Sequence, residues 1–104
     1  MSRGLPVGGV TVHRVYLRIL TKDDSPEVGE RIRKSVEELL SGEALSFSEF
    51  APYWKIEGWG ELNLTVDTTR DLRDIQNLLA DNWESDTASA DIRLPDVGFL
   101  WIGV

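Results

Sequence analysis

Residues 53–66 read YWKIEGWGELNLTV, and this stretch decides the predicted fold. Trp54 and Ile56 alternate with polar neighbours before a Gly-Trp-Gly sequence, and a second alternating run follows it as far as Val66. Alternation with a period of two is typical of half-buried strands, and glycine supplies the positive φ angles that tight connections need. The stretch therefore predicts a β-hairpin with Trp59 at its turn.

The two sides of this predicted hairpin differ in chemistry. Trp54 is expected in the core because it is in phase with Ile56, and the aliphatic residues of the second run are expected beside it. The other side would carry Tyr53, Lys55, Glu57, Glu61, Asn63 and Thr65. For Trp59 two outcomes stay open: the turn folds back and buries the ring, or the ring projects as a binding residue.

The chain before the hairpin predicts one strand and one helix. Residues 10–20 alternate and are rich in β-branched side chains, which favours a strand. Ser25 followed by Pro26 is typical of a helix start, and Gly42 is a plausible stop. A helix is therefore expected over 26–41.

The chain after the hairpin predicts a second helix and a final strand region. Residues 68–85 carry an apolar stripe through Leu72, Ile75 and Leu79 at helical spacing. Residues 90–104 favour strand structure, interrupted by a proline, an aspartate and a glycine, so two short strands or one bulged strand are expected. Its final FLWIGV is apolar on both faces, which suits an interior strand or one covered by a partner.

These elements predict an α+β fold with the order βαββαβ, which is that of a ferredoxin-like two-layer sandwich with a split last strand as a variant. We expect a flexible N-terminal arm over 1–9 and one domain over 10–104. In this architecture both helices cover one face of an antiparallel sheet, and the other face is open. That open face is expected to be mixed polar and aromatic.

Charge and composition narrow the partners. The 104 residues contain no cysteine and have a net charge of −7, and residues 53–104 hold ten acidic and only four basic residues. Nucleic acid and anionic membranes need a basic footprint, so neither is an expected partner. A basic protein surface is the natural complement, and solubility alone is the alternative explanation. A poor signal sequence and the lack of cysteine favour the cytoplasm.

No arrangement of residues in the sequence predicts catalysis. His13 is the only histidine, no serine has a nucleophile-elbow context, and no phosphate-binding glycine motif is present. Asp67, Asp71 and Asp74 follow one side of the second helix and its entry, but arginines are interleaved with them. A solvated helix face with local ion pairs or an acidic docking surface explains them better than a metal site. We therefore expect no enzyme activity, no cofactor and no metal.

The stretch PYWKIEGWGELNLTVDT, the Leu-rich helix after it and the terminal FLWIGV resemble small acidic immunity proteins of bacterial toxin–immunity systems. The resemblance is one of size, charge and layout. It implies an inhibitor that binds a cognate toxin in the producing cell. On this hypothesis two aromatic residues supply contact area and the acids steer and pair with basic residues of the toxin. The expected partner-binding residues are Tyr53, Glu57, Trp59, Glu61, Asp67, Asp71 and Asp74.

Two other functions stay open. The first is a homodimeric ligand-binding or regulatory module that pairs through its open sheet. The second is a small dimeric enzyme with a pocket between sheet and helices, in which His13, Tyr16 and Tyr53 would act as acid–base groups.

Overall fold

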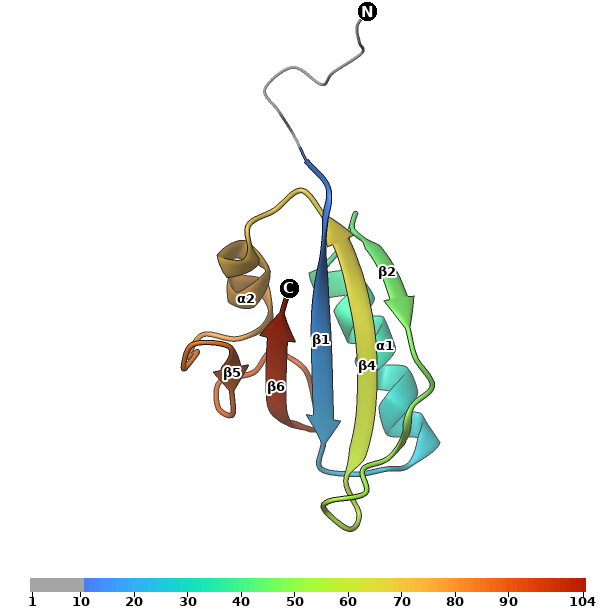
Figure 1. Cartoon of the computed structure of the whole chain (residues 1–104). Coiled ribbons are helices and arrows are strands. Elements are labelled where there is room, and N and C mark those ends of the chain that lie inside the picture. Colours follow the sequence, from blue (N-terminus) through green and yellow to red (C-terminus); the bar gives the residue numbers. More distant parts are fainter. Residues whose placement is uncertain (1–10) are drawn as a thin grey trace, which may run out of the picture.

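A computed structural model of the chain describes residues 11–104, so the arm expected over 1–9 lies outside the described residues. The fold is α+β: six antiparallel strands form one sheet, and two helices pack on it (Figure 1). Neighbouring strands follow the order β2-β4-β1-β6-β5, and β3 also pairs with β4. The elements are β1 (His13–Thr21), α1 (Pro26–Leu39), β2 (Ala44–Phe47), β3 (Ala51–Pro52), β4 (Gly60–Thr68), α2 (Leu72–Leu79), β5 (Thr87–Ala88) and β6 (Val97–Gly103).

The centre of the sheet is the antiparallel pair of β1 and β4; the sequence predicted both as strands but not that they pair. Each strand has nine residues, and the register places Leu17 opposite Leu64. Because side chains alternate across a strand, every second residue around this pair points to the same face, and these residues are buried. The aliphatic face of the sheet is therefore fixed by the pattern of period two.

Both helices cover that aliphatic face. Buried residues of α1 and α2, among them Ile32 and Ile75, join one hydrophobic cluster with the buried residues of β1, β4 and β6. Phe50 adds a wedge between the layers, because its ring lies against both Gly29 of α1 and Gly60 of β4. No side chain larger than hydrogen fits at these two glycines without moving that ring.

The first helix was predicted closely and the second was predicted too long. Helix α1 begins at Pro26 after the extended Ser25, and Gly42 takes a φ of +90° beyond its end. Helix α2 lacks the first residues of the predicted 68–85 because Thr68 still belongs to β4, where its hydroxyl accepts the Arg70 N–H at 2.9 Å. It ends early because the chain turns extended at Ala80.

The indole of Trp83 stabilises that early end. Its N–H donates to the carbonyl oxygens of Gln76, at 2.9 Å, and Ala80, at 3.2 Å. The Gln76 carbonyl also accepts the Ala80 N–H, at 3.0 Å, whereas the Ala80 carbonyl lies at the C-cap, where carbonyls lack the next helical turn. The Trp83 side chain thus packs against the core and also caps the end of α2.

The element order differs from the predicted βαββαβ, because the chain has two more strands. The edge strand beside β4 is split into β2 and β3: the Ser48 hydroxyl accepts the Asn63 N–H at 3.0 Å in place of a main-chain carbonyl. Phe50 then turns inward, and Pro52 has no N–H to continue the ladder. The short β5 is the other addition. A ferredoxin-like fold is therefore not established by this element order.

The predicted hairpin is wrong in its first half. In the segment directly before the turn, pairing with β4 stops after Ala51 and Pro52, and residues 53–59 form a loop. The loop is closed by the Tyr53 N–H, which donates to the Trp59 carbonyl at 2.7 Å. The predicted core position of Trp54 is wrong for the same reason, since its side chain lies outside the sheet.

The final strand region contains one strand, β6, with an irregular register. Phe99 lies opposite Leu20, but Val97 lies opposite Thr21, so Gly98 is left over as an extra residue. This agrees with the bulged strand that was one of the two predicted forms. Residues 90–96 form bends and a turn, with one isolated bridge between Ile92 and Ala80 but no strand.

Candidate functional site

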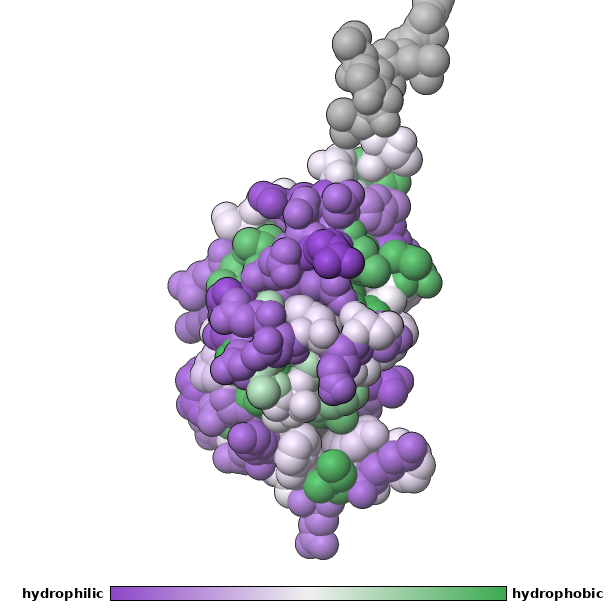
Figure 2. Space-filling view, turned by 90° about the vertical axis from the view of Figure 1, so that its left-hand side faces the viewer, coloured by the Kyte–Doolittle hydropathy of each residue, from purple (hydrophilic) through white to green (hydrophobic). Residues whose placement is uncertain are grey.

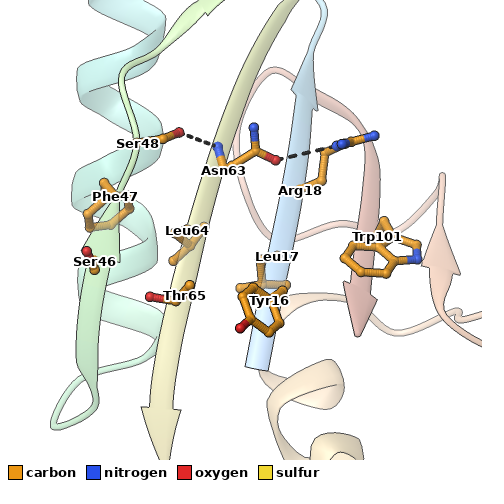
Figure 3. A pocket seen from close by; sticks show the side chains of 10 residues that line it. All are labelled: Tyr16, Leu17, Arg18, Ser46, Phe47, Ser48, Asn63, Leu64, Thr65 and Trp101. Atoms are coloured by element: carbon orange, nitrogen blue, oxygen red, sulfur yellow. Dashed lines mark hydrogen bonds between the residues drawn. The ribbon is translucent and has the colours of Figure 1, made fainter. Parts of the chain in front are cut away.

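The open face of the sheet, opposite the helices, carries aromatic and charged side chains. On β1 these are Tyr16 and Arg18, with the aliphatic Leu20 beside them, and on β6 they are Phe99 and Trp101. Figure 3 shows Tyr16, Arg18 and Trp101 on this side of the sheet, drawn from neighbouring strands. Because Leu20 pairs with Phe99 and Arg18 pairs with Trp101, the apolar groups form a continuous row along β1 and β6.

Two tryptophans lie flat against glycines of β6. A Cβ atom added to Gly103 would be 2.5 Å from the Trp101 ring, and one added to Gly98 would be 2.5 Å from Cη2 of Trp59. Trp59 is therefore half-buried against β6 and is not a free tip. With Phe99 between them, these rings form what we call the aromatic strip: Trp59, Phe99 and Trp101.

The 53–59 loop presents the most exposed aromatic side chain of the described residues. Trp54 is 81% exposed and Ile56 is 41% exposed. The Lys55 ammonium lies 5.0 Å from the centre of the Trp54 ring, and the Tyr53 and Trp54 rings are 6.5 Å apart. The loop thus holds a ring and an isoleucine in water, a placement that contributes little to folding.

Three adjoining depressions follow the open face. The largest, about 490 Å³, lies around Tyr16, Arg18 and Trp101 (Figure 3). A smaller one of about 220 Å³ shares Arg18 and Trp101 with it. The third, about 420 Å³, is lined by Leu20, Tyr53, Lys55, Ile56, Trp59, Gly98 and Phe99. We call this third depression the loop-end groove.

The acids on the open face are neutralised by arginines. The guanidinium of Arg14 donates to both carboxylate oxygens of Asp67, at 2.8 and 3.1 Å, and Nε of Arg18 is 3.1 Å from the Glu61 carboxylate. The hydrogen bond from Arg14 holds the pKa of Asp67 below its ordinary value. The same contact raises the pKa of Arg14. The face therefore has no surplus negative charge from these two acids.

The structure divides the expected partner-binding residues between the two ends of β4. The 53–59 loop contains Tyr53, Trp59 and the exposed Glu57. Glu61 is the second residue of the adjoining strand β4. The other three, Asp67, Asp71 and Asp74, follow at the far end, roughly 20 Å or more along the strand.

The three aspartates also differ among themselves in their surroundings. Asp67 is on the open face, whereas Asp71 precedes α2 and Asp74 is exposed in its first turn. The edge of the molecule that carries α2 and β5 is mainly hydrophilic in Figure 2, with apolar residues in small separate groups. Asp71 and Asp74, at the start of α2, do not line the loop-end groove.

Sequence reasoning missed Trp54, Ile56, Leu20 and Phe99 as residues of this site. The phase of Trp54 with Ile56 pointed to the core, and nothing in the sequence marked the loop. The apolar character of FLWIGV on both faces was a usable signal, because it suggested a strand covered by a partner. Trp101 fits that suggestion: its ring lies on the open face, and its indole donates to Asp86 at 3.1 Å.

The described residues show which of the chemical alternatives have their side chains close together. Within residues 11–104, no group of three or more histidine, cysteine or acidic side chains is placed to hold a metal. The three residues of the enzyme alternative are not brought together: His13 begins β1, Tyr16 is on the open face, and Tyr53 begins the 53–59 loop beyond the opposite end of β1. No described helix is long and apolar enough to span a membrane.

Comparison of the chain with protein-family models, with curated proteins and with solved structures found no match.

Proposed function

We propose that this chain is a protein-binding domain that docks through the loop-end groove and the exposed Trp54. One observation carries the proposal. A tryptophan 81% exposed stands beside an apolar depression floored by Leu20 and Phe99. Tryptophan is enriched among residues that dominate binding energy, and such residues work best beside a pocket that excludes water. Burying this ring against a partner removes apolar area from water that folding leaves exposed.

We further propose that the domain acts in the cytoplasm as an immunity-type inhibitor, covering a surface of a bacterial toxin. The net charge of −7 supports this proposal, because it attracts a basic protein at long range. Asp67 and Glu61 are already paired with Arg14 and Arg18. On this proposal the net charge of the protein therefore attracts the toxin at long range, and the loop-end groove makes the contact.

The finer fold assignment is also a proposal. The neighbour relation β2-β4-β1-β6, with one helix before β2 and one after β4, supports a ferredoxin-like arrangement. On this proposal β3 continues the edge strand begun by β2, and β5 is an addition at the other edge.

Affinity capture tests the binding proposal. Wild-type protein, Trp54→Ala and the control Val104→Ala are immobilised, and lysate of the source cell is passed over each at low salt. Val104 is a fair control because it is as exposed as Trp54, at 82%, but lies outside the groove. We expect one basic protein to be held by wild type and control, released by salt, and lost with Trp54→Ala. Equal capture by all three contradicts the proposal.

Co-expression tests the inhibitor proposal. The captured protein is expressed alone and together with each variant. We expect it to arrest growth alone, and wild type and Val104→Ala to restore growth where Trp54→Ala does not. If the captured protein has no effect on growth, the proposal of a binding domain stands and the proposal of a toxin inhibitor is rejected.

A second function has one observation in its favour. Because Arg14 and Arg18 pair with Asp67 and Glu61, the part of the open face around these residues carries little net charge, so two copies can meet there with little repulsion. The homodimeric ligand-binding or regulatory module predicts a dimer in sedimentation at about 50 μM, a concentration chosen to populate micromolar dimers. A dimer that Trp54→Ala dissociates would support this module over the inhibitor.

A further inference from the structure

We infer that the open face binds an extended segment of the partner protein, with bulky apolar side chains along the aromatic strip and a carboxylate at the loop end. This inference rests on the proposed function and specifies the chemistry of the segment that docks.

The charge of the lining residues carries the first step. The chain has 18 acidic residues, yet no carboxylate lines any of the three depressions, whose charged lining residues are Arg18 and Lys55. A basic side chain entering the loop-end groove would find no carboxylate there. An anionic group would find the Lys55 ammonium, so the groove is opposite in sign to the protein as a whole.

Two lysines near the groove, Lys22 and Lys55, have no ion pair within the described residues. Among residues 11–104, six arginines have an ion pair, namely Arg14, Arg18, Arg31, Arg33, Arg70 and Arg93. No ion pair involves Lys22 or Lys55, and both border the groove. Lys55 lines it, and Cε of Lys22 would be 3.3 Å from a Cβ atom added to Gly98. These two cations remain available to a ligand carboxylate.

The nearby acids do not cancel these lysines by direct contact. Glu61 is held by Arg18 and Asp96 by Arg31, at 3.1 and 2.9 Å. Asp23 accepts the N–H of Ser25 at 2.9 Å, which uses one of its oxygens. Glu57 is exposed in the 53–59 loop and does not line the groove. None of these four acids lines the groove, and no ion pair joins any of them to either lysine.

The spacing of the aromatic strip carries the third step. Phe99 and Trp101 are two residues apart on one strand, so their side chains repeat at about 7 Å. An extended peptide presents alternate side chains at the same interval. From Gly98 to Gly103 the strand rises roughly 17 Å, which corresponds to about five or six extended residues. A short extended segment therefore matches the strip in length and period.

Blocked heptapeptides test the inference. The probes are acetyl-LSFSLEE-amide and its counterparts ending in QQ and KK, titrated into the ¹⁵N-labelled full chain. The indole N–H signals of the four tryptophans are followed and assigned by Trp→Phe variants. Trp83 is the internal control, because its indole is tied to α2, away from the open face.

We expect the EE peptide to shift the signals of Trp54, Trp59 and Trp101 and to leave that of Trp83 unchanged. It should bind roughly threefold to fivefold more tightly than the QQ peptide, the range for exposed charge pairs, and the KK peptide should bind most weakly. Lys55→Gln should remove most of this preference. Lys34→Gln, a control on the exposed side of α1, should not.

Three results would overturn the inference: no saturable shift, equal or tighter binding of the KK peptide, or a shift confined to Trp83. If any of these results is obtained and capture of the partner still depends on Trp54, the proposed function stands and only the inference about the segment is rejected. If the peptide binds at the strip but capture of the partner does not depend on Trp54, the proposed docking of the partner is rejected. The assignment of the segment to that partner is then rejected as well.

Discussion

The two faces of the sheet differ in what their side chains contact. The covered face meets two helices and is built from aliphatic residues such as Ile19 and Leu62, which are almost completely buried. The open face meets water and is built from aromatic rings and arginine–carboxylate pairs. The same strands supply both faces, so β1 and β4 separate the residues that stabilise the fold from those available for binding.

Substitutions on opposite faces of β1 give the largest expected difference. Ile19→Ala removes a side chain that is 0% exposed and should lower the free energy of unfolding by about 2–5 kcal/mol. Tyr16→Ala, on a side chain 45% exposed, should cost less than about 1 kcal/mol. Urea unfolding followed by circular dichroism measures both. Equal losses would mean that the open face contributes to stability as the covered face does.

Two tryptophans give the next contrast. Trp83 packs against the core and caps α2, so Trp83→Ala should destabilise by roughly 2 kcal/mol, less than full burial would give. Trp54→Ala should change the unfolding free energy by less than about 0.5 kcal/mol. The same denaturation experiment decides, and a large loss with Trp54→Ala would show that the ring packs in solution.

Gly98→Ala tests the aromatic strip with a smaller effect. The added methyl group displaces the Trp59 ring and the end of Lys22, which are side chains that can move, so we expect a loss of about 1 kcal/mol. The indole signal of Trp59 should shift while that of Trp83 stays in place. An unchanged Trp59 signal would show that the ring does not lie on β6.

The pair of Arg14 and Asp67 gives the smallest effect, visible only in acid. Because folding lowers the pKa of Asp67, its contribution to stability is present above the unfolded pKa and is lost as pH falls below about 4. Wild type should therefore lose its advantage over Asp67→Asn on acidification. Thermal melts of both proteins between pH 7 and pH 2.5 test this, and parallel curves would contradict it.

Alternation and helix signals predicted the covered face well. The period of two in β1 and β4 and the Ser25-Pro26 start of α1 are local features, and local features are what sequence patterns record. The 53–59 loop defeated the same reasoning. Trp54 and Ile56 alternate as a strand would, but the pairing with β4 ends at Pro52, which has no N–H to continue the ladder.

The site could be predicted only in part, because it depends on register. Tyr53 and Trp59 were expected to bind and both line the loop-end groove. The sequence could not show that Arg14 lies opposite Asp67, or that Arg18 reaches Glu61, because cross-strand neighbours follow from the pairing of distant segments. Two of the acids expected to bind a partner, Asp67 and Glu61, are therefore held by arginines that precede them by more than 40 residues.

Hydrogen exchange of the chain with and without its captured partner tests the central claim most directly, that the open face at its loop end binds and the helices do not. The account predicts slower amide exchange on binding in residues 53–60 and 97–103, with α1 and α2 unchanged. Protection confined to 26–39 and 72–79, with the 53–59 loop exchanging as in the free protein, would contradict it.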